Sequence, residues 1–174
     1  MDKKINILFR YSLLIILAIP NFYLFYLVFT PLTLYPSFFL LKIFLNATLI
    51  ENIIHIGSTI IFLIGACIGG SAYYFLLALN ILTPNIKKRF SAIIFSFLSF
   101  LILNIIRIFL FVIIYSSSIN LFNATHLIFW YFGSTILVLG IWFFEVKRHS
   151  NRLDFWVYIF YFLVLKLENH KLFK

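Results

Sequence analysis

The longest uninterrupted apolar segment of this sequence runs from Ser91 to Tyr115 and contains one charged residue, Arg107. A helix of this length exceeds the roughly 20 residues that are needed to cross the hydrocarbon core of a bilayer. The rest of the chain has a similar character, with 64% hydrophobic residues and a mean hydropathy of +1.08. Soluble domains contain only about 45–50% apolar residues. The composition therefore excludes an ordinary soluble domain and predicts a single integral membrane domain over residues 1–174.

The other apolar runs predict an all-α, polytopic membrane helix bundle with about four to six membrane-embedded segments. The runs Tyr11–Thr30 and His126–Phe144 are each long enough to span a bilayer. A further run begins at Cys67 and ends near Leu82. Pro31 and Pro36 follow the first run and are expected to interrupt the chain there, because proline removes a helix hydrogen bond.

Two segments are harder to interpret. The segment 37–66 includes a β-branched stretch, Ile53–Ile64, which is centred on Gly57-Ser58. This pattern favours a short hairpin or re-entrant element before Cys67, and a second helix is the alternative. The apolar piece Phe155–Leu165 is too short for a span, so an interfacial or re-entrant helix is expected there.

Lysine and arginine gather between the apolar runs. The N-terminus before Tyr11, segment 84–90 and segment 145–154 each hold three of them, whereas segment 116–125 holds none. By the positive-inside rule, we expect a multi-pass cell-membrane protein with its N-terminus and both basic segments in the cytoplasm and 116–125 outside. The net charge of +9 is then explained by membrane orientation and contact with anionic lipid, rather than by nucleic acid binding.

This orientation directs three reactive side chains toward the external membrane face. Cys67 is the only cysteine, and its run leads from the outside inward. Arg107 lies eight residues before Tyr115, about 12 Å from the external end of its helix, and its long side chain can reach upward. His126 begins the run after 116–125. We therefore expect a thiol, a guanidinium and an imidazole to meet near that face.

Cys67 is the candidate nucleophile. Gly69 to Ser71 follow it directly, allow close backbone approach and expose free amide groups at a helix start. The positive end of the helix dipole there would favour the thiolate form. The alternative is that Cys67 is a small packing residue, as lone cysteines in membrane helices usually are.

Arg107 and His126 each have a functional and a structural interpretation. A guanidinium in the hydrocarbon region costs several kcal/mol and marks a functional candidate, and Asn104 lies one turn away to orient it. The alternative for Arg107 is an interaction with lipid phosphate. Thr125 is expected to cap the following helix, which would place His126 in the first turn as a neutral base. The alternative for His126 is an ordinary interfacial histidine.

The order of these residues resembles the exosortase and archaeosortase family of prokaryotic membrane enzymes. That family carries a cysteine in Ala-Cys-Ser-Gly, an arginine in Asn-x-x-Arg and a later histidine, each near the external ends of successive helices. Ile68 replaces the usual serine here, and Leu127 follows His126 where bacterial members commonly carry an acidic residue. The likeness covers roughly residues 50–145 and rests on Ala66-Cys67-Ile68-Gly69, Asn104-Ile105-Ile106-Arg107-Ile108, and His126 with Gly133 downstream.

The resemblance implies a thiol protease or transpeptidase that cleaves C-terminal sorting signals of surface proteins. Such a substrate carries a short motif, a transmembrane helix and a basic tail. Cys67 would form an acyl-enzyme, Arg107 would stabilise the thiolate or the oxyanion, and His126 would act as general acid and base. No metal or other cofactor is expected, because Glu51 and His55 offer too few ligands. The alternative is a non-catalytic membrane scaffold or transporter subunit in which Cys67 only packs.

Overall fold

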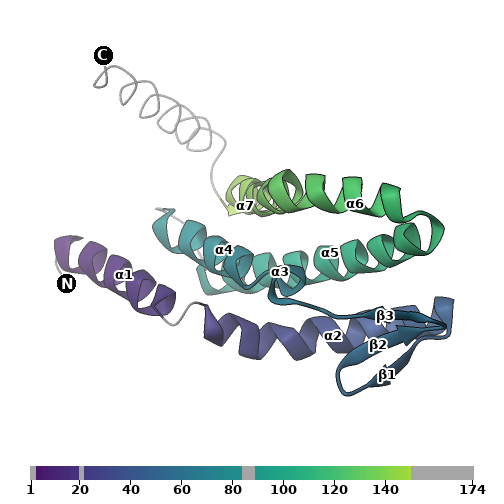
Figure 1. Ribbon diagram of the computed structural model, residues 1–174. Coiled ribbons are helices and arrows are strands. Elements are labelled where there is room, and N and C mark those ends of the chain that lie inside the picture. The colour runs from purple at the N-terminus through teal and green to yellow at the C-terminus, as the bar shows by residue number, and fades with distance from the viewer. Residues whose placement is uncertain (1–2, 20–21, 84–88, 150–174) are drawn as a thin grey trace, which may run out of the picture.

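The computed structural model describes residues 3–19, 22–83 and 89–149, and these form three layers of helices with a small sheet at one end (Figure 1). The lower layer holds α1 and α2, the middle layer α3, α4 and α5, and the upper layer α6 and α7. The elements in chain order are α1 (Lys3–Ala18), α2 (Tyr23–Leu45), β1 (Thr48–Ile50), β2 (Ile53–Ile56), β3 (Thr59–Ile61), α3 (Gly65–Ile68), α4 (Gly70–Leu82), α5 (Arg89–Ser117), α6 (Ile119–Ile128), the π-helix η1 (Phe129–Gly133) and α7 (Ser134–His149).

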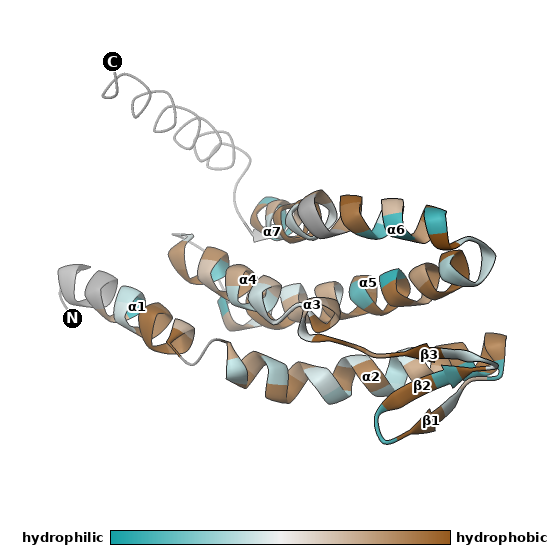
Figure 2. Cartoon of the chain, in the orientation of Figure 1, coloured by the Kyte–Doolittle hydropathy of each residue, from teal (hydrophilic) through white to brown (hydrophobic). Residues whose placement is uncertain are grey.

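Three helical segments of the described chain are long and apolar enough to cross a membrane: Tyr23–Leu45, Gly65–Leu82 and Arg89–Ser117. Apolar residues recur along these helices (Figure 2), and many large apolar side chains on them are exposed. On α5, for example, Leu98 and Ile102 are 53% and 58% exposed. Exposed apolar faces of this extent are suited to lipid and not to water. The fold is therefore a mostly helical membrane architecture, as the apolar runs predict.

The predicted span Tyr11–Thr30 is wrong, because α1 ends at Ala18 and α2 begins only at Tyr23. Phe22, which precedes α2, has a left-handed φ of 60° and cannot belong to a continuous right-handed helix. Pro31 and Pro36 do not interrupt the chain as expected but lie inside α2. Membrane helices tolerate such prolines when neighbouring helices and hydroxyl side chains surround the freed backbone groups.

The segment after α2 contains a three-stranded antiparallel sheet in the order β1-β2-β3. The predicted turn at Gly57-Ser58 is confirmed, and Gly57 has a φ of 58°. A second two-residue turn, Glu51-Asn52, has φ angles of 49° and 66°. Positive φ at these central positions gives turns whose twist matches that of the strands. The hairpin interpretation of 37–66 therefore holds for the part that follows α2. The first part of this segment, up to Leu45, belongs to α2. The prediction of an all-α fold is wrong at this sheet.

One face of the sheet packs against α2 and α5. Ile54 in the central strand is completely buried, as is Leu41 of α2, and Val112 of α5 closes the same cluster. The other face carries Ile50 and Ile60, which are 57% and 54% exposed. This alternation follows from the two-residue period of a strand. The sheet is thus anchored beside the C-terminal half of α5.

Aromatic rings fill the contact between α2, α4 and α5. Phe29 of α2 stacks on Tyr73 of α4 with ring centroids 3.5 Å apart, and Phe100 of α5 meets the same tyrosine edge-on at 4.8 Å. Tyr73 and Phe100 are almost completely buried. Aromatic pairs of this kind contribute on the order of 1 kcal/mol beyond the burial of their area. This core fixes the start of α4 against the middle of α5.

The segment 116–125, which is expected on the external side, is mostly helical. Ser118 caps α6, and its side chain accepts a hydrogen bond from the backbone N–H of Leu121. From Ile119 the backbone is helical through α6, η1 and α7 as far as His149. The predicted span His126–Phe144 lies within this stretch, and the prediction for Phe155–Leu165 falls outside the described residues.

Candidate active site

Cys67 lies in α3, a single helical turn between the sheet and α4. Gly69 ends this turn with a left-handed φ of 75°, and a Cβ atom at this position would lie 3.1 Å from the ring of Phe100. The left-handed φ favours glycine at this position, and a Cβ atom would require the Phe100 ring to move by a few tenths of an ångström. The thiol belongs to the turn before α4 and not to the first turn of α4, so the expected position of Cys67 at the start of that helix is wrong.

Asn104 of α5 holds the backbone of this turn. Its side chain is completely buried, and its Nδ2 donates to the carbonyl oxygens of Cys67 at 2.8 Å and Ile68 at 3.3 Å. The last carbonyls of a helix lack partners within the helix, and here a side chain from a neighbouring element supplies one. The sequence predicts that Asn104 orients Arg107, whereas the structure shows that it holds the backbone of Cys67 and Ile68.

Arg107 joins three elements at the same place. Its Nη2 lies 3.4 Å from the carbonyl oxygen of Cys67 and 3.5 Å from that of Ala66, and its Nη1 donates to Ser134 Oγ at 3.1 Å. The guanidinium also lies over the ring of Phe111, 6.0 Å from its centroid. These contacts direct the positive charge into the protein, beside Cys67, and not along the helix surface toward lipid phosphate.

His126 lies in the last turn of α6, so its predicted place in the first turn of a helix is wrong. Thr125 does not cap a helix, because its hydroxyl donates to the carbonyls of Leu121 and Phe122 inside α6. The imidazole instead packs in an aromatic setting. It stacks on Phe122 with centroids 5.3 Å apart and meets Phe111 edge-on at 5.6 Å. The prediction from the sequence did not identify Ser118 as a helix cap, so it placed the start of the helix too late in the chain.

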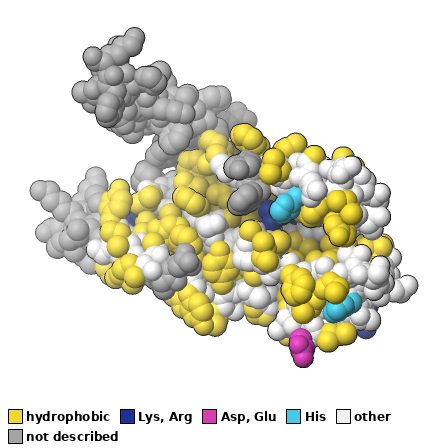
Figure 3. Space-filling model, in the orientation of Figure 1, with side chains coloured by type: hydrophobic (Ala, Val, Ile, Leu, Met, Phe, Trp, Pro, Cys, Tyr) yellow, Lys and Arg dark blue, Asp and Glu magenta, His cyan; other side chains and the backbone are white. Residues whose placement is uncertain are grey.

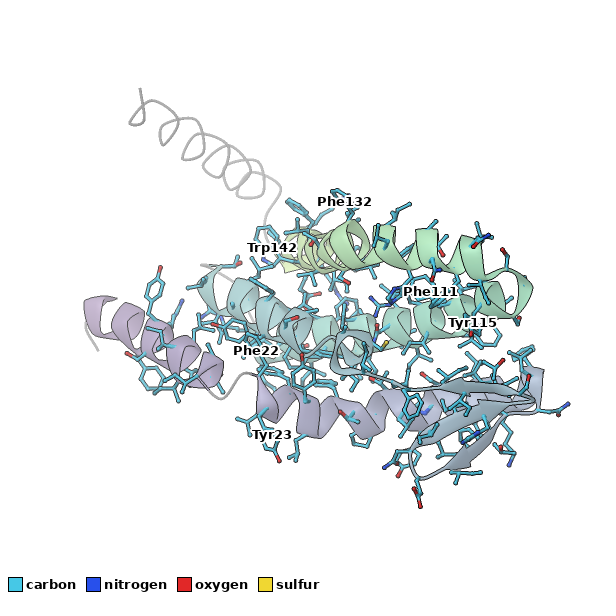
Figure 4. The ribbon with its side chains drawn as sticks, viewed as in Figure 1. Phe22, Tyr23, Phe111, Tyr115, Phe132 and Trp142 are labelled. Atoms are coloured by element: carbon cyan, nitrogen blue, oxygen red, sulfur yellow. The ribbon has the colours of Figure 1, made fainter. Side chains whose placement is uncertain are left out.

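Cys67 and His126 line the same cavity, which has a volume of about 240 Å³. One wall is formed by a single face of α5, in which four residues follow the i, i+3, i+4, i+7 spacing: Ile108, Phe111, Val112 and Tyr115. The ring of Phe111 lies between α5 and α6 (Figure 4). The opposite wall is β3 and its continuation, residues 60–63. The space-filling view shows a histidine and a basic side chain next to each other at a hollow between the layers (Figure 3).

The cavity is deep in the bundle. Because Asn104 bonds to Cys67, the thiol lies at the level of Asn104, 13 residues before the end of α5 at Ser117. At about 1.5 Å per residue this corresponds to a depth of about 20 Å along α5. Cys67 and His126 therefore line one cavity, and Arg107 lies beside Cys67 without lining it. Cys67 is recessed between the helices and not at their rim.

The π-helix η1 aligns His126 with Ser134. In an uninterrupted α-helix, residues eight positions apart are rotated by about 80° around the axis. In η1 the N–H of Ser134 donates to the carbonyl of Phe129, five residues earlier. Such a turn accommodates one additional residue, so His126 and Ser134 have the angular relation of residues about two α-helical turns apart. Both then face α5, where they contact Phe111 and Arg107.

Several residues of the site are absent from the sequence-based prediction. Ser134 is one hydroxyl in a long apolar run, and no local pattern marks it as the partner of Arg107. Phe111 and Phe122 are two of 24 phenylalanines. The four-residue stripe on α5 was the one available signal, because its helical spacing predicts a common face. The wall formed by residues 60–63 depends on tertiary packing and has no comparable signal.

Comparison of the chain with models of protein families, with curated proteins and with solved structures found no match. In the part of the chain that the structure describes, no three His, Cys, Asp or Glu side chains are grouped as metal ligands would be. The site combines a thiol, an imidazole and a fixed guanidinium around an apolar cavity. These are the groups that nucleophilic acyl transfer uses.

Proposed function

We propose that this chain is a membrane-embedded thiol protease or transpeptidase that cleaves C-terminal sorting signals of surface proteins. The observation that carries the proposal is the cavity shared by Cys67 and His126, with the Arg107 guanidinium 3.4 Å from the Cys67 carbonyl. The order of these residues in the sequence, which resembles the exosortase and archaeosortase family, supports the same reaction class.

In the proposed reaction, His126 takes the thiol proton of Cys67, Cys67 Sγ attacks the scissile carbonyl carbon, and the carbonyl electrons move onto its oxygen. Collapse of this intermediate breaks the C–N bond, and His126 gives a proton to the leaving amine. Water or an acceptor amine then attacks the thioester, His126 takes up its proton, and the thiol is restored. A positive charge near the reacting carbonyl stabilises the negative oxygen most strongly where water is excluded, which suits a guanidinium beside Cys67 at an apolar cavity.

The proposed orientation places the basic segments in the cytoplasm and the sheet on the external side. This assignment depends on the lysine and arginine counts and on the positive-inside rule. The substrate's own transmembrane helix would lie against the exposed apolar surface of the bundle. The peptide segment next to that helix would then reach the cavity from the external side.

The test is the processing of a co-expressed reporter that ends in an apolar helix of about 20 residues and a basic tail, taken from the genome that encodes this chain. Cys67→Ala, Arg107→Ala and His126→Ala are each expected to lower the rate of processing at least about 100-fold, because each removes a group that acts in the reaction. His55→Ala is the matched control, since His55 lies in β2 and not among the residues that line the cavity. It should process the reporter at the rate of the original chain.

Immunoblots of the membrane fraction must show equal abundance of all four variants. A Cys67→Ala variant that still processes the reporter would exclude the enzyme and favour the scaffold interpretation. In the scaffold interpretation, Arg107 binds a partner protein, so Arg107→Ala would weaken that complex. Cys67 would then serve only to fill space between the helices.

A further inference from the structure

Strand β3 is an edge strand of the sheet and also part of the wall of the cavity. It pairs with β2 on one side, and in the described residues no further strand pairs with its other side. Ile60 of β3, and Phe62 just after it, are 54% and 61% exposed. Both also line the cavity that holds Cys67.

The register of the hairpin shows which backbone groups of β3 face outward. The two-residue turn joins Ile56 and Thr59, which therefore form a hydrogen-bonded pair. Hydrogen-bonded and non-hydrogen-bonded pairs alternate along an antiparallel ladder, so Ile60, opposite His55, belongs to a non-hydrogen-bonded pair. The N–H and C=O of Ile60 thus point away from β2, toward the open edge.

A peptide that reaches Cys67 must enter a mostly apolar cavity. Its backbone N–H and C=O groups lose their water there, and each unpaired group costs free energy. The open edge at Ile60 offers both a donor and an acceptor in the geometry of a strand. From Ile60 the wall continues to Leu63, four residues before Cys67, so the edge leads directly to the thiol.

We propose that the substrate binds as an extended segment that pairs with β3 as a fourth strand and so delivers its scissile carbonyl to Cys67. This inference rests on the proposed function and names the mode of substrate recognition. Alternate side chains of the bound segment would face the cavity, which is lined by apolar and aromatic residues. The occupant is therefore an extended peptide with apolar side chains at every second position.

Proline substitutions at the two edges of the sheet test the pairing. Ile60→Pro removes the outward N–H of β3 and leaves the ladder to β2 intact. It is expected to lower processing of the reporter at least 10-fold, whereas Ile60→Val, which keeps the N–H, should change it less than 3-fold. Leu49→Pro is the matched control, because Leu49 opposite Ile54 is also a non-hydrogen-bonded pair, at the edge of β1. It should process the reporter within 3-fold of the original chain.

Cross-linking tests the same pairing without catalysis and without proline. The enzyme carries Cys67→Ala and Ile60→Cys, and single cysteines are moved along the reporter segment that precedes its apolar helix. Copper phenanthroline and oxygen supply the oxidant for the disulfide. Paired strands should give disulfides at every second reporter position, because side chains of a strand alternate between its faces.

The outcomes separate this inference from the proposed function. Equal cross-linking at all reporter positions, or disulfides only between two copies of the enzyme, would overturn the pairing with β3. Full activity of Ile60→Pro would also overturn the pairing with β3, because only a substrate that pairs with the strand needs the N–H of Ile60. The proposed function itself fails only if Cys67→Ala still processes the reporter.

Discussion

Asn104 and Arg107 lie one turn apart on α5 and act on the same backbone oxygen, that of Cys67. Asn104 holds it at 2.8 Å with a buried amide, and Arg107 approaches at 3.4 Å with a positive charge. A charged side chain in the hydrocarbon region is costly, and hydrogen bonds to several elements lower that cost. The pair fixes the height and the rotation of the Cys67 turn relative to the longest helix.

Gly69 gives a prediction at this scale. Gly69→Ala should destabilise the protein by roughly 2–4 kcal/mol, because alanine disfavours a φ of 75° and its Cβ would press on Phe100. Thermal unfolding in detergent measures this as a lower Tm. Gly140→Ala is the control, since a Cβ there meets no atom within 4 Å, and it should leave Tm equal or raise it slightly. Equal Tm values for the two variants would contradict the role of Gly69.

The sequence was informative about single residues where a polar group stands alone in an apolar run. Cys67, Arg107 and His126 are predictable on this basis, and all three lie at one site. Ser134 is not predictable in this way, because it belongs to the site only through its hydrogen bond with Arg107, 27 positions away in the chain. A hydroxyl can bond to its own helix in any apolar run, so its presence there predicts no partner.

Among the elements, η1 has the clearest consequence for the site, because it sets the rotation of His126 relative to Ser134. A π-helix contains one residue more than the α-helical turn that it replaces, and such turns often mark functional sites. Removing one residue from η1 should restore a continuous α-helix in which His126 and Ser134 are seven positions apart and stay on one face, whereas adding one residue should rotate His126 by about 100° relative to Ser134.

Insertion of one alanine after Phe132, which is 66% exposed, tests this rotation. We expect helix content by circular dichroism to be retained and reporter processing to fall at least 10-fold, because the imidazole no longer faces the cavity. Phe132→Ala keeps the chain length and should process normally. Normal processing by the insertion variant would show that the alignment of His126 with Ser134 is not needed.

The sheet illustrates how far local signals extend. Gly57-Ser58 within a β-branched stretch predicts a turn, and the structure has it. The turn at Glu51-Asn52 escaped prediction because it places two non-glycine residues at positive φ, which is uncommon. The break before α2 also escaped, because hydropathy alone does not distinguish one helix from two consecutive ones. Composition is thus enough to predict a membrane protein. The points at which one helix or strand ends and the next begins depend on a few backbone angles that composition does not predict.

For the whole molecule, the depth of the cavity determines which reagents reach the thiol. A small, membrane-impermeant methanethiosulfonate applied from outside should modify Cys67, whereas a maleimide carrying a polyethylene glycol chain should react at least 10-fold more slowly, because the cavity holds about 240 Å³. Gel shifts on intact cells give the rate of the polyethylene glycol reagent, and the thiol that remains for that reagent after denaturation gives the rate of the small one. The control, Cys67→Ser combined with Ser118→Cys, presents an exposed thiol at the start of α6 that both reagents should modify at similar rates. Modification of Cys67 only after permeabilisation would overturn the proposed orientation.

Because two side chains of α5 hold the Cys67 turn, the sulfur cannot follow a substrate up or down in the bilayer. A polypeptide anchored by its own hydrophobic stretch has a vertical position set by lipid thickness. The bundle would then act as a ruler, selecting the peptide bond that arrives at a fixed height. Lengthening or shortening the anchor by a few residues would move the cut by a corresponding number of positions.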